Sequence, residues 1–193
     1  MDYFFQEGAT QQQLVLAFHG TGGNEYQLLT TVAELFPQAS LLSFLGSVSE
    51  GNQRRFFAPL IDGQLNRQEF DQQTTQFFQE EFLTFIQKYQ EIILIGYSNG
   101  ANFILGLLEQ HADIADTVIL LHPSRLVYSF NQSSEVKIYL TVGAQDNISL
   151  PGDGLKLTEE LKQFFPNTTM ILTDGGHQLT EQEVNDIQKR LGE

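Results

Sequence analysis

The chain has 193 residues, carries a formal net charge of −14 and contains no cysteine. An acidic surface repels phosphate backbones and anionic lipid headgroups, which argues against nucleic-acid binding and anionic membranes, and the lack of thiols excludes disulfides and cysteine nucleophiles. The first residues lack the basic and apolar regions of a signal peptide, and no apolar run is long enough to span a bilayer. We therefore expect one soluble cytoplasmic domain over residues 1–193, whose oligomeric state the sequence leaves open.

Short aliphatic runs alternate with helical patterns along the chain. Several runs are apolar without polar alternation, as expected of parallel strands that are covered on both faces. The runs are residues 14–18, 41–45, 92–95, 118–121, 136–142 and 169–172. Strands that alternate with helices predict an α/β domain with a mostly parallel central sheet and helices on both faces. In such sheets functional groups collect at the carboxyl ends of the strands.

Three segments are expected to be helices. Residues 101–110 can form a helix after the third aliphatic run. The last helix follows Thr180, whose spacing to Glu183 matches a capping box, and its apolar residues then fall on one face. Between the second and third runs, residues 68–89 carry an apolar stripe at helical spacing, which we interpret as core packing rather than a ligand site. The residues of this stripe are Phe70, Phe77, Phe78, Phe82, Phe85, Ile86 and Tyr89.

The motif Gly96-Tyr97-Ser98-Asn99-Gly100 matches G-x-S-x-G between a predicted strand and a predicted helix. A nucleophile on such a sharp turn takes a strained conformation, and its neighbours two residues away must be small. The turn would raise the Ser98 hydroxyl above the sheet, near the positive end of the next helix. The alternative is a glycine-rich turn with an incidental serine, and the flanking strand and helix weaken it. We therefore interpret Ser98 as a nucleophile.

A serine nucleophile needs a base and an acid that orients the base, and this kind of turn presents them in the chain order Ser, Asp/Glu, His. Of the four histidines, His177 alone follows a suitable acid that itself follows Ser98. Asp146 lies directly beyond a predicted strand and is the favoured acid. Asp153, a few residues further on, is the alternative, whereas Asp174 lies too near His177 for the usual role.

Two further histidines, His111 and His122, have less direct interpretations. His111 ends a predicted helix, where a positive charge suits the helix dipole, and we expect a structural role for it. His122 ends the strand that follows the nucleophile strand, so it could line a substrate pocket. It precedes the candidate acid in the chain, which makes it a poor candidate for the base.

The segment Phe18-His19-Gly20-Thr21-Gly22-Gly23-Asn24-Glu25 follows the first aliphatic run. An oxyanion needs main-chain N–H donors, one from the residue after the nucleophile and one from the loop after an early strand. These donors would be Asn99 and Thr21. A phosphate-binding glycine loop is the alternative, but its third glycine would fall at Glu25 and no lysine follows.

Taken together, these segments resemble the α/β-hydrolase superfamily, and within it the small phospholipase/carboxylesterase-type serine hydrolases. The resemblance runs from about residue 14 to residue 191, and its most specific pieces are residues 19–25, 96–102 and 175–180. Residues 50–57 resemble the E-x-G-x-x-R-x-F-F-type stretch of this group. The resemblance implies hydrolysis of esters or thioesters through an acyl-enzyme without metal or cofactor, with Ser98 as nucleophile, Asp146 as orienting acid and His177 as base.

The short chain leaves little room for a sizeable cap domain, so we expect an open site. The favoured function is a serine carboxylesterase that acts on small-molecule esters with small or medium acyl groups. A thioesterase or lysophospholipase with the same triad is the alternative, and a non-catalytic binding module on a hydrolase fold is less favoured. Candidate pocket residues are Gly20, Arg55, Phe56, Phe57 and His122, although the phenylalanines would equally well pack inward.

Overall fold

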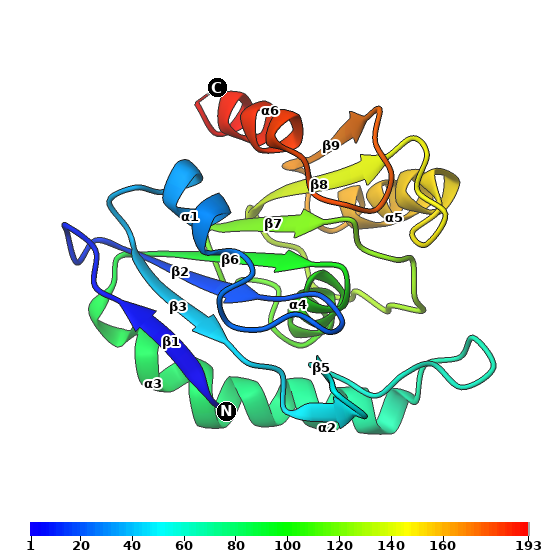
Figure 1. The fold of residues 1–193 in the computed structure, drawn as a ribbon, viewed down its shortest axis with the longest axis horizontal. Helices are drawn as coiled ribbons and strands as arrows, with labels where there is room; N and C mark the ends of the chain where they lie inside the picture. Colours follow the sequence, from blue (N-terminus) through cyan, green and yellow to red (C-terminus); the bar gives the residue numbers. More distant parts are fainter. Residues whose placement is uncertain (193) are drawn as a thin grey trace.

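The computed structural model describes residues 1–192, so the last residue of the predicted domain, Glu193, lies outside the described residues. Within residues 1–192, seven strands form one sheet in the order β1-β3-β2-β6-β7-β8-β9 (Figure 1). Neighbouring strands from β3 to β9 run parallel, and β1 pairs antiparallel with β3. The bounds are β1 Tyr3–Gln6, β2 Gln13–Phe18, β3 Ser40–Phe44, β6 Glu91–Tyr97, β7 Thr117–Leu121, β8 Lys137–Gly143 and β9 Thr168–Thr173.

All six strands expected from the aliphatic runs are present, and the mostly parallel sheet is confirmed. Two further features were not predicted. The edge strand β1 is largely exposed and mixes aromatic with polar residues, so it lacks the continuous apolar pattern of a buried strand. A hairpin of β4 (Val48–Glu50) and β5 (Gln53–Arg55) forms a separate two-stranded sheet of mainly polar residues.

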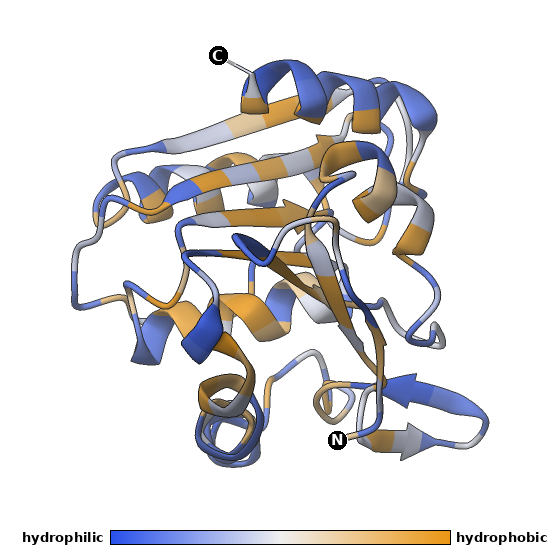
Figure 2. Ribbon diagram, turned by 90° about the vertical axis from the view of Figure 1, so that its left-hand side faces the viewer, coloured by the Kyte–Doolittle hydropathy of each residue, from blue (hydrophilic) through white to orange (hydrophobic). Residues whose placement is uncertain are grey.

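Helices cover both faces of the sheet, as predicted, and successive residues of each strand face opposite sides. Leu14, Leu16 and Phe18 of β2 pack in the core shared with α2, α4 and α5, whereas Val15 and Ala17 pack in the core shared with α1 and α6. Figure 2 shows hydrophobic residues gathered in the central strands and hydrophilic ones on the outer helix surfaces. The helices are α1 Leu29–Leu35, α2 Arg67–Phe77, α3 Leu83–Phe85, α4 Asn99–Gln110, α5 Pro151–Lys162 and α6 Glu181–Leu191.

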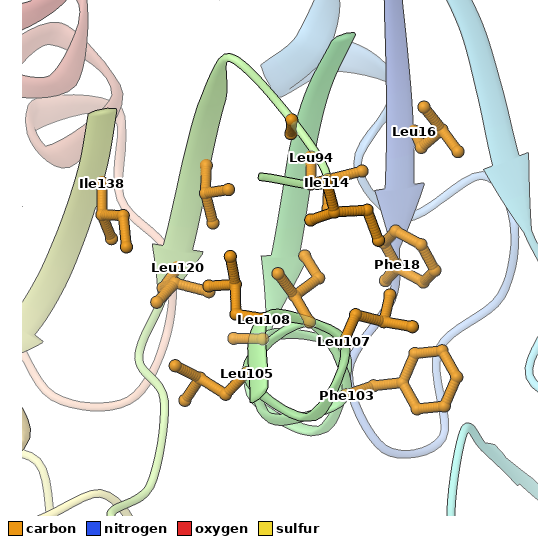
Figure 3. Close-up of a cluster of buried hydrophobic side chains, with 14 of the residues drawn as sticks. Leu16, Phe18, Leu94, Phe103, Leu105, Leu107, Leu108, Ile114, Leu120 and Ile138 are labelled. Atoms are coloured by element: carbon orange, nitrogen blue, oxygen red, sulfur yellow. The ribbon is translucent and has the colours of Figure 1, made fainter. Parts of the chain in front are cut away.

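Helix α4 is the central helix of the larger core. Every residue from Asn99 to Leu108 is buried, and Figure 3 shows Leu107 and Leu108 on the side of the helix that faces the strands, near Phe18 and Leu120. A helix that is buried on all sides holds a fixed position relative to the sheet. This anchors the turn that precedes α4, where Ser98 lies.

The predicted helix over residues 68–89 is helical but not regular. Helix α2 passes at Phe78 into a π-helical turn over Phe78–Phe82, followed by α3 and a 3₁₀ turn over Ile86–Lys88. Phe77 and Phe82 are both buried, and their five-residue spacing matches the wider π turn rather than the α-helical repeat. The stripe forms part of the core as predicted.

The described chain carries no large cap domain, which agrees with the expectation from its length. Among residues 1–192, none of the helices combines the length and the apolar character that a bilayer crossing requires.

Candidate active site

Ser98 occupies the sharp turn between β6 and α4, at the carboxyl edge of the parallel sheet. Its backbone angles are φ 51° and ψ −106°, a conformation that residues with a side chain rarely adopt. A Cβ atom at Gly96 would lie 2.6 Å from the Ala101 nitrogen, and one at Gly100 would lie 2.2 Å from the Phe18 carbonyl oxygen. Only glycine fits these two positions, and the turn therefore has the strained geometry that exposes a nucleophile.

The three side chains predicted to form a triad lie together. His177, in the loop after β9, places Nε2 2.9 Å from the Ser98 Oγ and Nδ1 2.8 Å from the Asp146 Oδ2. Asp146 follows β8, and its second oxygen accepts hydrogen bonds of 2.8 Å from the amides of Ile148 and Ser149. The fold thus brings together three side chains from the ends of three strands, in the order that a serine nucleophile requires.

The environment of Asp146 favours the ionised carboxylate. Burial alone would raise the pKa of this fully buried side chain, but the hydrogen bonds from His177, Ile148 and Ser149 outweigh burial and lower it. A carboxylate that accepts from Nδ1–H leaves the lone pair of Nε2 facing Ser98, which is the tautomer a general base needs.

The two alternative aspartates lie elsewhere. Asp153 is in the first turn of α5, where its carboxylate pairs with Lys156 at 3.7 Å. Asp174 is exposed, and its main-chain carbonyl accepts a hydrogen bond from the Gln145 side chain. Neither carboxylate forms a hydrogen bond or ion pair with His177 in the described structure.

In the loop after β2, the glycine amides on either side of Thr21 are hydrogen-bonded, whereas the Thr21 amide is not. Gly20 N–H donates to the Gln27 side chain at 2.8 Å, Gly22 N–H to the Arg54 carbonyl at 3.0 Å, and Gly23 N–H to the Gly20 carbonyl at 3.0 Å. Within residues 1–192 the Thr21 amide has no acceptor. The Asn99 amide, in the first turn of α4, has none either. These are the two donors that the sequence predicted for an oxyanion hole.

Two side chains that were given no role in the sequence analysis hold this loop. His19 is buried; its Nδ1 lies 2.6 Å from the Gly20 carbonyl oxygen and its Nε2 accepts from the Gly46 amide at 2.9 Å. Burial lowers its pKa, which agrees with a neutral ring protonated on Nδ1. Tyr97 lies beneath Gly20, where an added Cβ would come within 2.6 Å of its ring. The motif could not reveal Tyr97, because G-x-S-x-G accepts any residue there.

Three candidate pocket residues are buried, which for the two phenylalanines favours the alternative of inward packing. Phe56 is 1% exposed, packs against the Phe18 and Phe103 rings, and borders a cavity of about 160 Å³ whose lining does not include Ser98. Phe57 packs edge-on against a core phenylalanine, 4.9 Å between ring centroids. The His122 side chain is fully buried. The apolar rings gain more by joining the core than by lining an open site.

The other two candidates have structural partners. Gly20 is buried against Tyr97, and Arg55 lies in the β4–β5 hairpin, where its side chain is 3.4 Å from Glu50. His111 is structural, as expected, but not as a cation: its ring stacks on Phe78, and burial lowers its pKa. The charge argument was therefore wrong for this histidine.

The predicted capping box at α6 is half formed. Thr180 caps the helix by accepting from the Glu183 amide at 3.3 Å, but the Glu183 carboxylate does not return to Thr180. It is buried and lies 3.0 Å from the His122 Nε2. A buried imidazole is a stronger partner for a carboxylate than an exposed amide in this position.

His122, Asp146 and His177 also lie close enough to one another to share a metal ion in principle. Their facing atoms, however, are hydrogen-bonded at 2.8 and 3.2 Å. Asp146 Oδ2 is hydrogen-bonded to the Nδ1 atoms of both rings, and the Nε2 of His177 is hydrogen-bonded to Ser98. The arrangement therefore fits a hydrogen-bonded line that orients the His177 ring towards Ser98.

No protein-family model matches the sequence. The carboxylesterase of Bacillus cereus is 30% identical, with a TM-score of 0.88 over 100% of this chain and 93% of that one. MhqD of Bacillus subtilis (strain 168), whose assignment as a hydrolase is provisional, is 29% identical over 98% of this chain and 96% of its own length. The acyl-protein thioesterase 2 of Zea mays shares the fold, with 17% identity and a TM-score of 0.79 over 99% of this chain and 97% of that one. The chain belongs to the α/β-hydrolase superfamily, among its small phospholipase/carboxylesterase-type members, and is an ester hydrolase.

Proposed function

We propose that this protein is a serine carboxylesterase in which Ser98, His177 and Asp146 form the catalytic triad. The observation that carries the proposal is the hydrogen-bonded line from Ser98 Oγ through both His177 nitrogens to Asp146 Oδ2, at 2.9 and 2.8 Å. The strained turn at Ser98 and the two unpaired amides at Thr21 and Asn99 support the same assignment. We also propose that residues 1–193 act as one catalytic domain.

In the proposed mechanism, Ser98 Oγ attacks the ester carbonyl carbon while His177 Nε2 takes the hydroxyl proton. The oxyanion that forms accepts hydrogen bonds from the Thr21 and Asn99 amides. Collapse of this intermediate breaks the ester bond, and His177 gives its proton to the leaving alkoxide, which departs as the alcohol. Water then donates a proton to His177 and attacks the acyl-enzyme, which releases the acid and restores Ser98.

We infer the substrate class from the elements around the site. The chain has no large cap, and two of the aromatic candidates for a pocket are buried in the core. Little wall remains to bind a long acyl chain, so we infer activity on esters of small or medium acyl groups. The carboxylesterase of Bacillus cereus, the relative at 30% identity, supports oxygen esters over thioesters.

The first test is intact-protein mass spectrometry after a fluorophosphonate probe, on the wild type and on Ser98→Ala. One adduct on the wild type and none on Ser98→Ala is the expected result. Ser124→Ala is the matched control, because Ser124 has a half-buried hydroxyl bonded to Ser149 at 2.9 Å and should keep its adduct. No adduct on folded wild type would favour a non-catalytic binding module.

Turnover then distinguishes the substrate classes. A series of p-nitrophenyl esters of increasing acyl length should give the highest kcat/KM at the short end. Loss of Ser98 should lower kcat about 10⁴–10⁶-fold. A matched pair of oxygen and thio esters, together with a lysophospholipid, tests the alternative. Faster hydrolysis of the thioester or the lysophospholipid would replace the simple esterase by that alternative.

A further inference from the structure

Asp146 has a second histidine partner behind the triad. The same Oδ2 atom that meets His177 lies 3.2 Å from the Nδ1 of His122. The other nitrogen of that ring, Nε2, lies 3.0 Å from the Oε2 of Glu183. The hydrogen-bonded line therefore continues beyond the triad and ends on helix α6.

This extension is buried throughout. The His122 and Asp146 side chains are fully buried, and the Glu183 side chain is 1% exposed. One Glu183 oxygen, Oε1, has no hydrogen-bond partner among the described residues. A buried ion pair rarely adds stability over apolar residues of the same size, and an unpaired carboxylate oxygen makes it costlier. The stability of the fold alone does not account for these two residues.

The backbone of His122 is also held in an unusual conformation. Its φ is 50°, and it is one of three residues other than glycine with positive φ among the described residues. The Thr141 hydroxyl accepts from its amide at 3.2 Å, and the Ser149 hydroxyl donates to its carbonyl at 3.0 Å. In this conformation the ring meets Asp146, and such strain is typical of functional positions.

The partners of the His122 ring limit which of its two nitrogens can carry a proton. With Glu183 ionised, both ring nitrogens face carboxylates and both carry protons, whereas with Glu183 protonated, Nε2 accepts and Nδ1 keeps its proton. In either state Nδ1–H donates to Asp146. The titratable groups that face the ring are Asp146, Glu183, His177 at 5.5 Å between centroids and Tyr97 at 6.2 Å.

We propose that His122 and Glu183 are positioning residues for the catalytic reaction, in which Glu183 holds the His122 ring so that its Nδ1–H fixes the Asp146 carboxylate against His177. This rests on the proposed triad function. Asp146 Oδ1 is held by two amides, and His122 holds Oδ2 as a second partner beside the catalytic ring. The carboxylate plane is then set from both ends, which aligns the His177 ring with Ser98.

The principal test is Glu183→Gln, an isosteric neutral variant, assayed over the acid limb of kcat/KM. We expect kcat to fall on the order of 10-fold with KM unchanged, as for other residues that orient a catalytic group. The acid limb should move to higher pH, because a neutral His122 removes a positive charge close to His177. Ile187→Val is the control, since Ile187 is a fully buried apolar residue of the same helix and offers no polar group to this line.

The outcomes separate the two proposals. A Glu183→Gln variant with wild-type kcat and an unmoved acid limb would overturn the positioning role. So would a fall in kcat that Ile187→Val reproduces, if the acid limb is the same in both variants. If Glu183→Gln does not fold, the paired variant His122→Gln with Glu183→Gln removes both charges together, and wild-type kcat there would also overturn it. A wild type that no fluorophosphonate labels would instead overturn the triad itself.

Discussion

The Tyr97 hydroxyl donates a 2.8 Å hydrogen bond to the main-chain carbonyl of His177, 80 residues further along the chain. The Tyr97 ring lies 5.5 Å from the His177 ring and also fills the space where a Cβ of Gly20 would lie. The residue next to Ser98 therefore contacts both the loop that carries the proposed base and the loop that carries the proposed oxyanion donor. Because Tyr97 is next to Ser98 in the chain, it holds the serine, the His177 loop and the Gly20 loop in a fixed arrangement.

We predict that Tyr97→Phe lowers kcat/KM about 10-fold, because a misplaced base can cost up to about 10²-fold in rate. The variant keeps the ring and loses only the hydroxyl, so its free energy of unfolding should fall by about 1 kcal/mol. Steady-state kinetics and urea unfolding measure the two effects. Tyr139→Phe is the control, because Tyr139 also donates to a main-chain carbonyl, that of Arg190 at 3.2 Å. Equal losses of activity in both variants would contradict a specific role for Tyr97.

The strain at Ser98 predicts a gain of stability when activity is removed. Ser98→Gly should raise the free energy of unfolding by about 1 kcal/mol, since the strain of about 1–3 kcal/mol exceeds the entropic cost of glycine. The midpoint of thermal unfolding should then rise by about 2–4 °C. Ser98→Ala keeps the Cβ and the strain, so its midpoint should stay near that of the wild type. A Ser98→Gly variant no more stable than Ser98→Ala would show that the turn is not strained.

A pH dependence of stability follows from His122. Burial lowers its pKa, but the hydrogen bond and charge of Glu183 and then those of Asp146 outweigh burial, and the pKa is raised above 6.5. A base whose pKa is raised by folding binds its proton more tightly in the native state. Its contribution to stability is therefore complete below pH 6.5 and is lost as the pH rises through the raised value.

Urea unfolding at a series of pH values above 6.5 should thus show a free energy of unfolding that falls as the pH rises. The paired variant His122→Gln with Glu183→Gln should flatten this slope. His19 does not interfere, because its lowered pKa confines its own contribution to lower pH. An equal slope in the paired variant would show that the proton is not held between Asp146 and Glu183.

The oxyanion loop gives a further prediction. Gln27 accepts a 2.8 Å hydrogen bond from the Gly20 amide, next to the Thr21 amide that is free to bind an oxyanion. Gln27→Ala should lower kcat by less than loss of a whole oxyanion donor, which costs about 10²–10³-fold. We expect about 10-fold, with KM unchanged. Gln11→Ala, which loses an exposed bond to Glu7, is the control and should keep full activity. An unchanged kcat in Gln27→Ala would mean that Gln27 does not position this loop.

The sequence predicted the parts of the fold that have a strong local pattern. Buried parallel strands read as continuous aliphatic runs, so all six were expected, and G-x-S-x-G placed Ser98 on its turn. The exposed edge strand β1 carries no such pattern and was missed. The π turn at Phe78 was missed as well, because a stripe at mixed spacing fits a regular helix almost equally well.

The sequence could not predict side-chain roles that depend on contacts between distant segments. Glu183 was assigned to a capping box, since its spacing from Thr180 is the same whether its carboxylate returns to the helix start or turns inward to His122. The aromatic pair Phe56 and Phe57 was open between pocket and core, and burial against Phe18, Phe103 and Phe70 places it in the core. The spacing of residues along the chain does not distinguish between such alternative positions of a side chain.

By itself, the sequence determined the class of fold, the turn at Ser98 and the chain order of acid and base. These properties depend on periodicity and on neighbours within a few residues, which the sequence records directly. Only the tertiary structure decided which further side chains lie against the proposed triad. Tyr97, His122 and Glu183 are hydrogen-bonded to partners that lie 24 to 80 residues away, and the packing of β6, β7 and α6 around Asp146 brings them together.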